Sequence, residues 1–510
     1  MRSLAALVLI ALGGNLATAA EYPFVFKDVG DDAGIFPHAA GIRGHAVAWG
    51  DADGDGWPDL FVGTFHNSGS KPGVFLRNNK GKFQLDKQEH LRTSGIGSGA
   101  LFADLTNSGR LDLYVSHCAH GTAGVTAIPS LLFRNDGKGQ FTDVSKNSGA
   151  CPPGYSGRGL TALDFDGDGL LDLLTCEQYY TPKVKTGQAL YRNKGDYRFE
   201  NVSEAVGLPV GLGGLSVTAA DVFRWKLDSP EDTPAGVCIG DVNRDGLPDI
   251  VIGHHFKSPW TTPASIRLYL NRGVKDGVPT FEDITDAAGL KPLQMKAPHV
   301  EIQDFDNDGW PDIYVSIVKF QDGNPCPVIY KNLGVVDGLP RFREDAWAVN
   351  DWPTAEDKAL KRAGPLFEKA LKEKKIIYMA AGPSADFDRD GKLDLFLANW
   401  WIESRSLLLR NETPGGNFLD VRVEGKAGVN RMGIGARVDV YLAGKLGESA
   451  ALLGSREIGI GYGFCSGQEA VAHFGLGKHD AVDVNVTLPH GKGKWAQKGV
   501  KANQSLTAKP

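Results

Sequence analysis

Short apolar runs alternate with glycine-rich, acidic turns along most of the chain. Runs of small residues such as 44–49 precede an acidic turn, and runs rich in β-branched or aromatic residues such as 59–62 follow it. A third run then ends in asparagine, as at 74–78, before a glycine turn and an aromatic residue, here Phe83. Runs of this length bounded by turn residues are typical of β-strands. The pattern predicts an all-β chain of repeated four-stranded units.

The acidic turns share a nine-residue pattern with an oxygen-bearing side chain at positions 1, 3, 5 and 9 and glycine at position 6. Five copies are complete: Asp51, Asp53, Asp55 and Asp59; Asp164, Asp166, Asp168 and Asp172; Asp241, Asn243, Asp245 and Asp249; Asp304, Asp306, Asp308 and Asp312; Asp386, Asp388, Asp390 and Asp394. Such donors can surround one hard cation, and glycine permits the sharp bend. An EF-hand would need a twelfth-position glutamate and flanking helices, whereas here a strand follows. We therefore expect about five Ca²⁺ sites.

A sixth turn, 104–112, keeps the bend but carries Thr106 and Ser108 in place of two carboxylates. Units of this size cannot bury both faces alone, so they are expected to pack around a common axis as propeller blades. Six repeats favour six blades, and a seventh without an acidic turn remains possible in the long intervals 164–241 or 304–386. Residues 24–29 match the outer-strand segment 281–284 and are expected to close the ring by pairing with the last blade.

These repeats resemble FG-GAP/VCBS repeats, the propeller type of integrin α-subunits. The tail carries Gly433-Ile434-Gly435-Ala436-Arg437-Val438, then His473-Phe474-Gly475-Leu476-Gly477 and Leu488-Pro489-His490-Gly491, and it resembles the ASPIC/UnbV domain. Chains that pair the two are similar to the cartilage acidic protein-like family. The resemblance implies a β-propeller at 21–412 and a small all-β domain at 416–510. Alternating apolar segments in the tail independently predict strands.

Residues 1–20 have a positive start, a short apolar core and small residues at 17–20, the pattern of a secretory signal peptide. No later stretch approaches the length of a membrane-spanning apolar segment. We therefore expect a secreted protein, extracellular or periplasmic, without a membrane span. The formal net charge of −6 and the lack of a basic tract argue against nucleic acid as a partner.

Several histidines map to the ends of strands opposite the acidic turns. The candidates are His45, His66, His117, His254 and His299. Imidazoles that converge there could hold a transition metal or act as acid–base groups. They could equally be polar residues that make local hydrogen bonds. Two long insertions, at about 207–236 and 351–375, are expected to enter by the same face.

The sequence lacks a nucleophile elbow, a phosphate loop and a C-x-x-C pair. The favoured function is a calcium-binding adhesion or binding module for an extracellular protein or carbohydrate. The alternatives are a metal-dependent enzyme with a histidine-lined site and a purely structural envelope or matrix component.

Overall fold

The computed structural model describes residues 23–65, 69–118, 128–153, 157–176, 188–208, 234–254, 265–293, 296–321, 324–343, 376–399 and 405–510. The predicted signal peptide, His66 and most of both insertions lie outside these ranges. The described chain is nearly all β, as predicted. Its helical elements are the four-residue α1 (Ser145–Ser148) and the short 3₁₀ turns η1 (Glu89–Leu91), η3 (Ser449–Ala451) and η4 (Pro489–Gly491). No described helix has the length and apolar character needed to cross a membrane.

The first four repeats each form an antiparallel sheet whose strands follow chain order. Their strands are β2 (Gly44–Gly50), β3 (Asp59–Thr64), β4 (Val74–Asn79) and β5 (Lys82–Leu85); β6 (Gly97–Ala103), β7 (Asp112–His117), β8 (Leu131–Gly137) and β9 (Gln140–Asp143); β10 (Gly159–Leu163), β11 (Asp172–Cys176), β12 (Ala189–Asn193) and β13 (Phe199–Asn201); β14 (Pro234–Gly240), β15 (Asp249–His254), β16 (Arg267–Lys275) and β17 (Val278–Asp283). In each sheet the acidic turn joins the first strand to the second, as the repeat pattern predicts.

The fifth and sixth repeats vary this arrangement. The fifth comprises β18 (Val300–Gln303), β19 (Asp312–Gln321) and β20 (Asn324–Tyr330), followed by the hairpin β21 (Asn332–Val336) and β22 (Leu339–Phe342). The sixth comprises β23 (Ile376–Ala381), β24 (Ser384–Ala385), β25 (Asp394–Asn399) and β26 (Leu407–Asn411). Its outer strand is β1 (Phe26–Asp28), which pairs antiparallel with β26. The prediction that the N-terminal segment pairs with the last repeat is confirmed.

Asparagine side chains tie neighbouring sheets together. In five of the six repeats, the asparagine at or near the end of the third strand donates from Nδ2 to a backbone carbonyl in the acidic turn of the preceding sheet. These bonds are Asn78 to Phe387 (2.9 Å), Asn135 to Ala52 (2.7 Å), Asn193 to Leu105 (2.8 Å), Asn332 to Val242 (2.9 Å) and Asn411 to Phe305 (2.8 Å). Five of the six described sheets are thereby fastened to the one before them, and for the first sheet that neighbour is the sixth.

The junction between the third and fourth sheets differs. Asn271 of the fourth sheet donates to Pro248 of its own sheet (3.0 Å), and no strand pairing or hydrogen bond links the two sheets among the residues the structure describes. A closed propeller ring therefore remains a prediction, although the all-β class is confirmed. Each interval considered for a seventh blade contains a long stretch outside the described ranges, 209–233 in one and 344–375 in the other, so the blade number also remains open.

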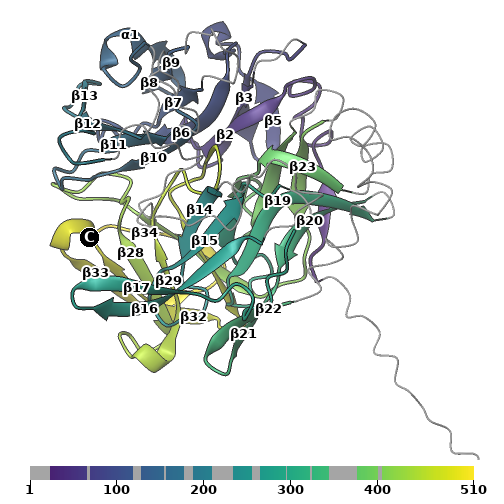
Figure 1. The fold of residues 1–510 in the computed structure, drawn as a ribbon, viewed down its shortest axis with the longest axis vertical. Coiled ribbons are helices and arrows are strands. Elements are labelled where there is room, and N and C mark those ends of the chain that lie inside the picture. Colours follow the sequence, from purple (N-terminus) through teal and green to yellow (C-terminus); the bar gives the residue numbers. More distant parts are fainter. Residues whose placement is uncertain are drawn as a thin grey trace, which may run out of the picture.

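The C-terminal region forms two further sheets. One contains β27 (Asn417–Val423), β31 (Ala472–Gly477) and β34 (Gln504–Ala508); the other contains β28 (Arg437–Leu442), β29 (Leu452–Glu457), β32 (Ala481–Thr487) and β33 (Lys494–Lys501). Figure 1 shows these yellow-green strands packed beside the repeat sheets. Leu419, Val438 and Val484 share one hydrophobic core with Leu101 and Leu160 of the second and third sheets. The C-terminal domain is therefore built into the molecule by a common core.

Candidate metal loops and the docked C-terminal domain

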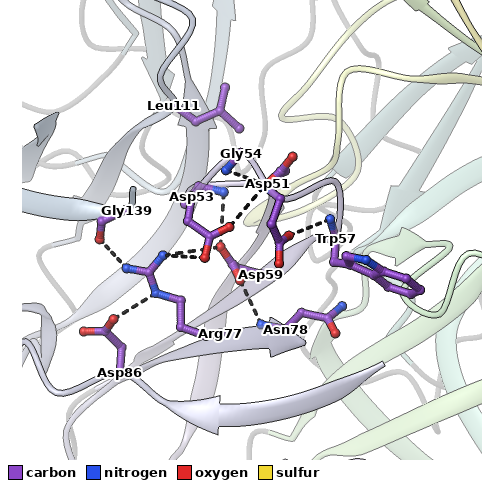
Figure 2. A network of polar contacts seen from close by, with 12 residues as sticks. Asp51, Asp53, Gly54, Trp57, Asp59, Arg77, Asn78, Asp86, Leu111 and Gly139 are labelled. Carbon is purple, nitrogen blue, oxygen red and sulfur yellow. Dashed lines mark hydrogen bonds and ion pairs between the residues drawn. The ribbon is translucent and has the colours of Figure 1, made fainter. Parts of the chain in front are cut away.

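The first acidic turn shows how the backbone fixes the position-one carboxylate (Figure 2). Asp51 accepts hydrogen bonds from the backbone N–H groups of Gly54 (2.8 Å) and Gly56 (2.9 Å). Gly56 has a φ of 94°, which disfavours other residues. The bond from the position-six N–H recurs in all six turns, with distances of 2.7 to 3.1 Å in the other five. The shape of the turn alone therefore requires glycine at position six, whether or not an ion is bound.

The position-nine aspartate links the turn to the third strand. Asp59 is fully buried, and it accepts hydrogen bonds from the N–H groups of Ala52 (3.1 Å) and Asn78 (2.8 Å). The bond from the third-strand asparagine recurs in the other five repeats at 2.7 to 2.9 Å. A carboxylate at this position therefore has a structural role in every repeat. This includes the second repeat along the chain, whose turn 104–112 carries Thr106 and Ser108 in place of two carboxylates.

Carboxylates converge within the complete loops. In four loops, three carboxylate oxygens lie within 4.8 Å of one another: Asp51, Asp53 and Asp55; Asp164, Asp166 and Asp172; Asp304, Asp306 and Asp308; Asp386, Asp388 and Asp394. In the remaining complete loop, the Asn243 amide instead donates to Asp245 (2.9 Å). In four of the five predicted ligand sets, three of the four residues are thus brought together as a cluster.

Burial and mutual repulsion destabilise the ionised form of these carboxyl groups when no counter-ion is present. Desolvation raises the pKa of Asp59, Asp249 and Asp386 to about 8, and neighbouring carboxylates add to the effect. The Asp388 Oδ1 atom is buried without a hydrogen-bond partner in the part of the chain described. An orphaned oxygen beside other carboxylates fits a hard cation such as Ca²⁺.

Basic side chains from the third strand already approach several clusters. Lys331 Nζ lies 2.8 Å from Asp306 and 2.7 Å from Asp308. Burial alone would lower the pKa of Lys331, but the carboxylates of Asp312, Asp306 and Asp308 raise it. In Figure 2, Arg77 similarly reaches towards Asp53, 3.4 Å away. The equivalent position in the fourth repeat is Leu270, so that loop has no such neighbour.

The C-terminal domain covers the loop face and contacts the fourth residue of several turns. These residues have a left-handed backbone at Asn107, Arg244, Asn307 and Arg389, with φ of 56°, 61°, 54° and 57°. The Arg431 N–H donates to Asn107 Oδ1 (2.7 Å), and His473 Nε2 lies 2.8 Å from Asn307 Oδ1. Position four looks like a spacer in the sequence. It is in fact the point at which the turns meet the second domain.

The sixth repeat makes an ionic version of this contact. Both terminal nitrogens of Arg389 lie 3.0 Å from the Glu469 carboxylate, and Arg422 NH2 lies 3.0 Å from the same group. Desolvation alone would raise the pKa of Glu469, but the two guanidinium groups lower it to about 2. Glu469 therefore stays charged over the physiological range and joins the loop of Asp386 to the C-terminal domain.

Residues 458–468 extend from the C-terminal domain into the centre of the repeats. Val237 of β14 exchanges backbone hydrogen bonds with Gly463 (2.8 and 3.2 Å), and Thr161 of β10 donates to Ile460 (2.6 Å). Strand β30 (Ser466–Gly467) pairs parallel with β2. The segment thus contacts the first strands of separate sheets. Ile458, Ile460, Tyr462 and Phe464 alternate with glycine, but this alternation alone does not reveal the central position of the segment.

A buried polar network anchors this central segment in the fifth sheet. The Phe464 N–H donates to His299 Nδ1 (3.0 Å), and Gln468 Nε2 donates to Glu301 (2.8 Å). His299 Nε2 lies 3.1 Å from the Glu301 carboxylate. Burial alone would raise the pKa of Glu301, but hydrogen bonds with His299, Ser384 and Gln468 lower it. His299 therefore helps to hold two regions of the chain together.

The histidine candidates are enclosed by protein wherever they are described. His45, His117, His254 and His299 are 2%, 1%, 3% and 0% exposed. His45 Nδ1 lies 3.1 Å from the Ser98 carbonyl oxygen, and His117 Nδ1 lies 2.7 Å from that of Pro129. Among the described residues, no group of three potential metal ligands includes a histidine. The catalytic and transition-metal hypothesis therefore remains a prediction without a supporting cluster.

Comparison with known proteins identifies both regions. Residues 51–115, 129–175 and 241–315 match the FG-GAP-like repeat, and residues 426–510 match the family described as ASPIC and UnbV. Human cartilage acidic protein 1 is 27% identical over 459 residues, covering 87% of this chain and 59% of that protein. The mouse protein is 26% identical and covers 87% and 60%. The chain thus spans about three fifths of the length of these relatives.

Likeness to solved structures is weak. AofleA from Arthrobotrys oligospora aligns at a TM-score of 0.27 and 11% identity, covering 60% of this chain and 88% of that one. A score this low carries no argument about fold or function. The sequence matches, in contrast, fall on acidic turns and strands of the first five repeats and on the C-terminal sheets. This chain contains FG-GAP-like repeats followed by an ASPIC and UnbV domain, and its relatives include proteins named cartilage acidic protein 1.

Proposed function

We propose that the chain is an extracellular binding module whose acidic loops bind Ca²⁺ and thereby stabilise the docking of the C-terminal domain. The observation that supports this most directly is the convergence of three carboxylates in each of four loops. When bound, Ca²⁺ would supply positive charge that turns repulsion among these carboxylates into attraction. The ligands would be the aspartates, with Asn243 in the fourth repeat, at positions 1, 3, 5 and 9.

The docking geometry explains how ion binding would affect the whole molecule. Gly416 N–H donates to the Asp306 carbonyl oxygen (3.1 Å), and Gly477 N–H donates to that of Asn307 (2.8 Å). These bonds join the C-terminal domain to the backbone of the fifth loop. A cation that fixes the conformation of this loop would also fix these acceptors. Calcium would therefore act on stability and domain association.

The partner is proposed to be an extracellular protein or carbohydrate. The described loop face is occupied by the C-terminal domain, so a partner would bind elsewhere on the sheets. The relatives named cartilage acidic protein 1 are consistent with an extracellular matrix setting. Arrays of extracellular proteins and of glycans, probed with the full chain in calcium and in EDTA, would test this. Binding to no array member in calcium would contradict the proposal.

Calcium binding is tested by thermal unfolding of Asp306→Asn. Asp306 belongs to a complete cluster, so the variant is expected to lose part of the rise in Tm that Ca²⁺ gives the unmodified chain. Asp104→Asn is the matched control because its turn, 104–112, has only two acidic positions left. The control is expected to retain the calcium-dependent rise. Equal rises in both variants and the unmodified chain would contradict the assignment.

A further inference from the structure

A cavity of about 300 Å³ lies at the junction between the third and fourth sheets. The junction lacks the asparagine bond that fastens the other described sheets: among the described residues, Asn271 Nδ2 makes only the bond within its own sheet, which the other asparagines make as well. The C-terminal domain bridges it instead: Thr161 of the third sheet donates to the Ile460 carbonyl oxygen (2.6 Å), and Val237 of the fourth sheet exchanges backbone hydrogen bonds with Gly463 (2.8 and 3.2 Å). The cavity is therefore enclosed by three separate parts of the fold.

The walls of this junction cavity are largely apolar. Leu163 comes from the third sheet, Ile239 from the fourth, and Ile434 and Ile458 from the C-terminal domain. Ile458 and Ile434 are otherwise part of the shared hydrophobic core. Pockets that bind small molecules combine such walls with a few placed polar groups, and their volumes begin at about 300 Å³. The cavity is of a size to hold one compact organic molecule.

Three charged residues border the cavity: Arg456 and Asp164 have hydrogen-bond partners, and the Glu457 side chain has none among the described residues. The Arg456 guanidinium is held by the Ile302 carbonyl and by Gln303 Oε1 (2.7 Å), so it is not available to its neighbour Glu457. Asp164 also borders the cavity, but its carboxylate is held by the third loop through Gly167 and Gly169. The Glu457 backbone pairs with Arg437 in the sheet, but its side chain makes no hydrogen bond or ion pair with any described residue. The one carboxylate left to the cavity lacks a counter-charge.

The surroundings of Glu457 favour a positively charged ligand. The residue ends β29, is exposed to solvent, and borders the cavity. Desolvation raises the pKa of its carboxyl group, with no cation nearby to oppose the shift. A ligand that brings a positive charge to this point would gain an ion pair with a carboxylate that no described cation neutralises.

We propose that the junction cavity binds a small organic amine, with its apolar body between Leu163, Ile239 and Ile458 and its ammonium group on Glu457. Apolar walls distinguish this site from the oxygen-lined acidic loops, so a bare metal ion is not its ligand. The proposal is independent of calcium binding and of the extracellular partner, since neither the loop carboxylates nor the docking contacts serve as its recognition group.

Calorimetric titration of the full chain in calcium buffer tests this with three probes of one shape. Phenethylamine is expected to bind, and neutral 2-phenylethanol and acidic 3-phenylpropionate are expected to bind at least roughly tenfold more weakly. Glu457→Gln should reduce the affinity for the amine by roughly tenfold and leave that for the alcohol unchanged. Glu448→Gln is the control, because Glu448 pairs with Lys445 and is exposed.

A second variant tests the location separately from the charge. A Cβ atom added at Gly459, which lines the cavity, meets no atom within 4 Å, so Gly459→Leu adds bulk without a clash at that position. Its circular dichroism and Tm should match those of the unmodified chain, while binding of all three probes falls. Equal affinity for the amine and the acid, or unchanged amine binding in a folded Gly459→Leu or Glu457→Gln variant, would overturn the proposal.

Discussion

Replacement of Glu469 by glutamine tests how firmly the C-terminal domain is joined to the repeats. Glu469 has a side-chain exposure of 8% and binds Arg389 and Arg422, each at 3.0 Å. Glutamine keeps the shape and removes the charge, which leaves Arg389 without its main counter-ion. Breaking a buried ion pair costs about 3 to 5 kcal/mol. The lowered pKa, from 4.5 to about 2, independently corresponds to about 3 kcal/mol at about 1.4 kcal/mol per pKa unit.

Urea unfolding in calcium buffer measures this difference. Glu469→Gln is expected to lower the free energy of unfolding by about 3 kcal/mol. Glu448→Gln, which removes an exposed pair with Lys445, should change it by less than about 1 kcal/mol. If the two variants lose the same small amount, the Glu469 contact is not a stabilising link between the regions and the reasoning from its burial fails.

Four further outcomes follow from the same structure. Because the pKa of Glu469 is lowered on folding, its contribution to the free energy of unfolding is present above about pH 4.5 and is lost as the pH falls towards about 2. Between these pH values, Glu469→Gln should therefore lose less stability than the unmodified chain in an acid titration. Lys331→Met removes the cation beside Asp306 and Asp308, so its calcium-dependent rise in Tm should exceed that of the unmodified chain; an equal or smaller rise would contradict this role. Phe464→Ala, at a fully buried position of the central segment, should cost about 3 to 5 kcal/mol in urea unfolding, and a loss below about 1 kcal/mol would show that the centre tolerates a void. Deletion of residues 23–28 removes the strand paired with β26 and should lower the Tm and expose the sixth sheet to protease; an unchanged digestion pattern would contradict this.

The repeat units could be predicted because their signals are local. Each acidic turn needs glycine for its bend and aspartate to accept nearby N–H groups, so the pattern around Asp51 or Asp304 is readable within nine residues. Pairing of the N-terminal strand with the sixth sheet could also be predicted, because residues 24–29 match an outer strand of another repeat.

The central segment and the open junction could not be predicted in this way. Residues 458–464 alternate apolar residues with glycine, but the partners of the central segment, such as His299, lie far away in the sequence and cannot be read from that pattern. Asn271 looks the same as Asn193 in its local sequence, yet it lacks the bond to a preceding sheet because that bond depends on how two sheets are placed. Position four of the turns was hidden for the same reason, since only the folded chain brings Asn307 to His473.

Equilibrium dialysis against calcium, followed by elemental analysis of the full chain, tests the central claim most directly. About five calcium ions per chain are expected, one for each complete acidic turn, and Asp306→Asn should reduce the count by about one while Asp104→Asn leaves it unchanged. A chain that retains no calcium at millimolar concentration, or a count that is insensitive to Asp306→Asn, would contradict the account.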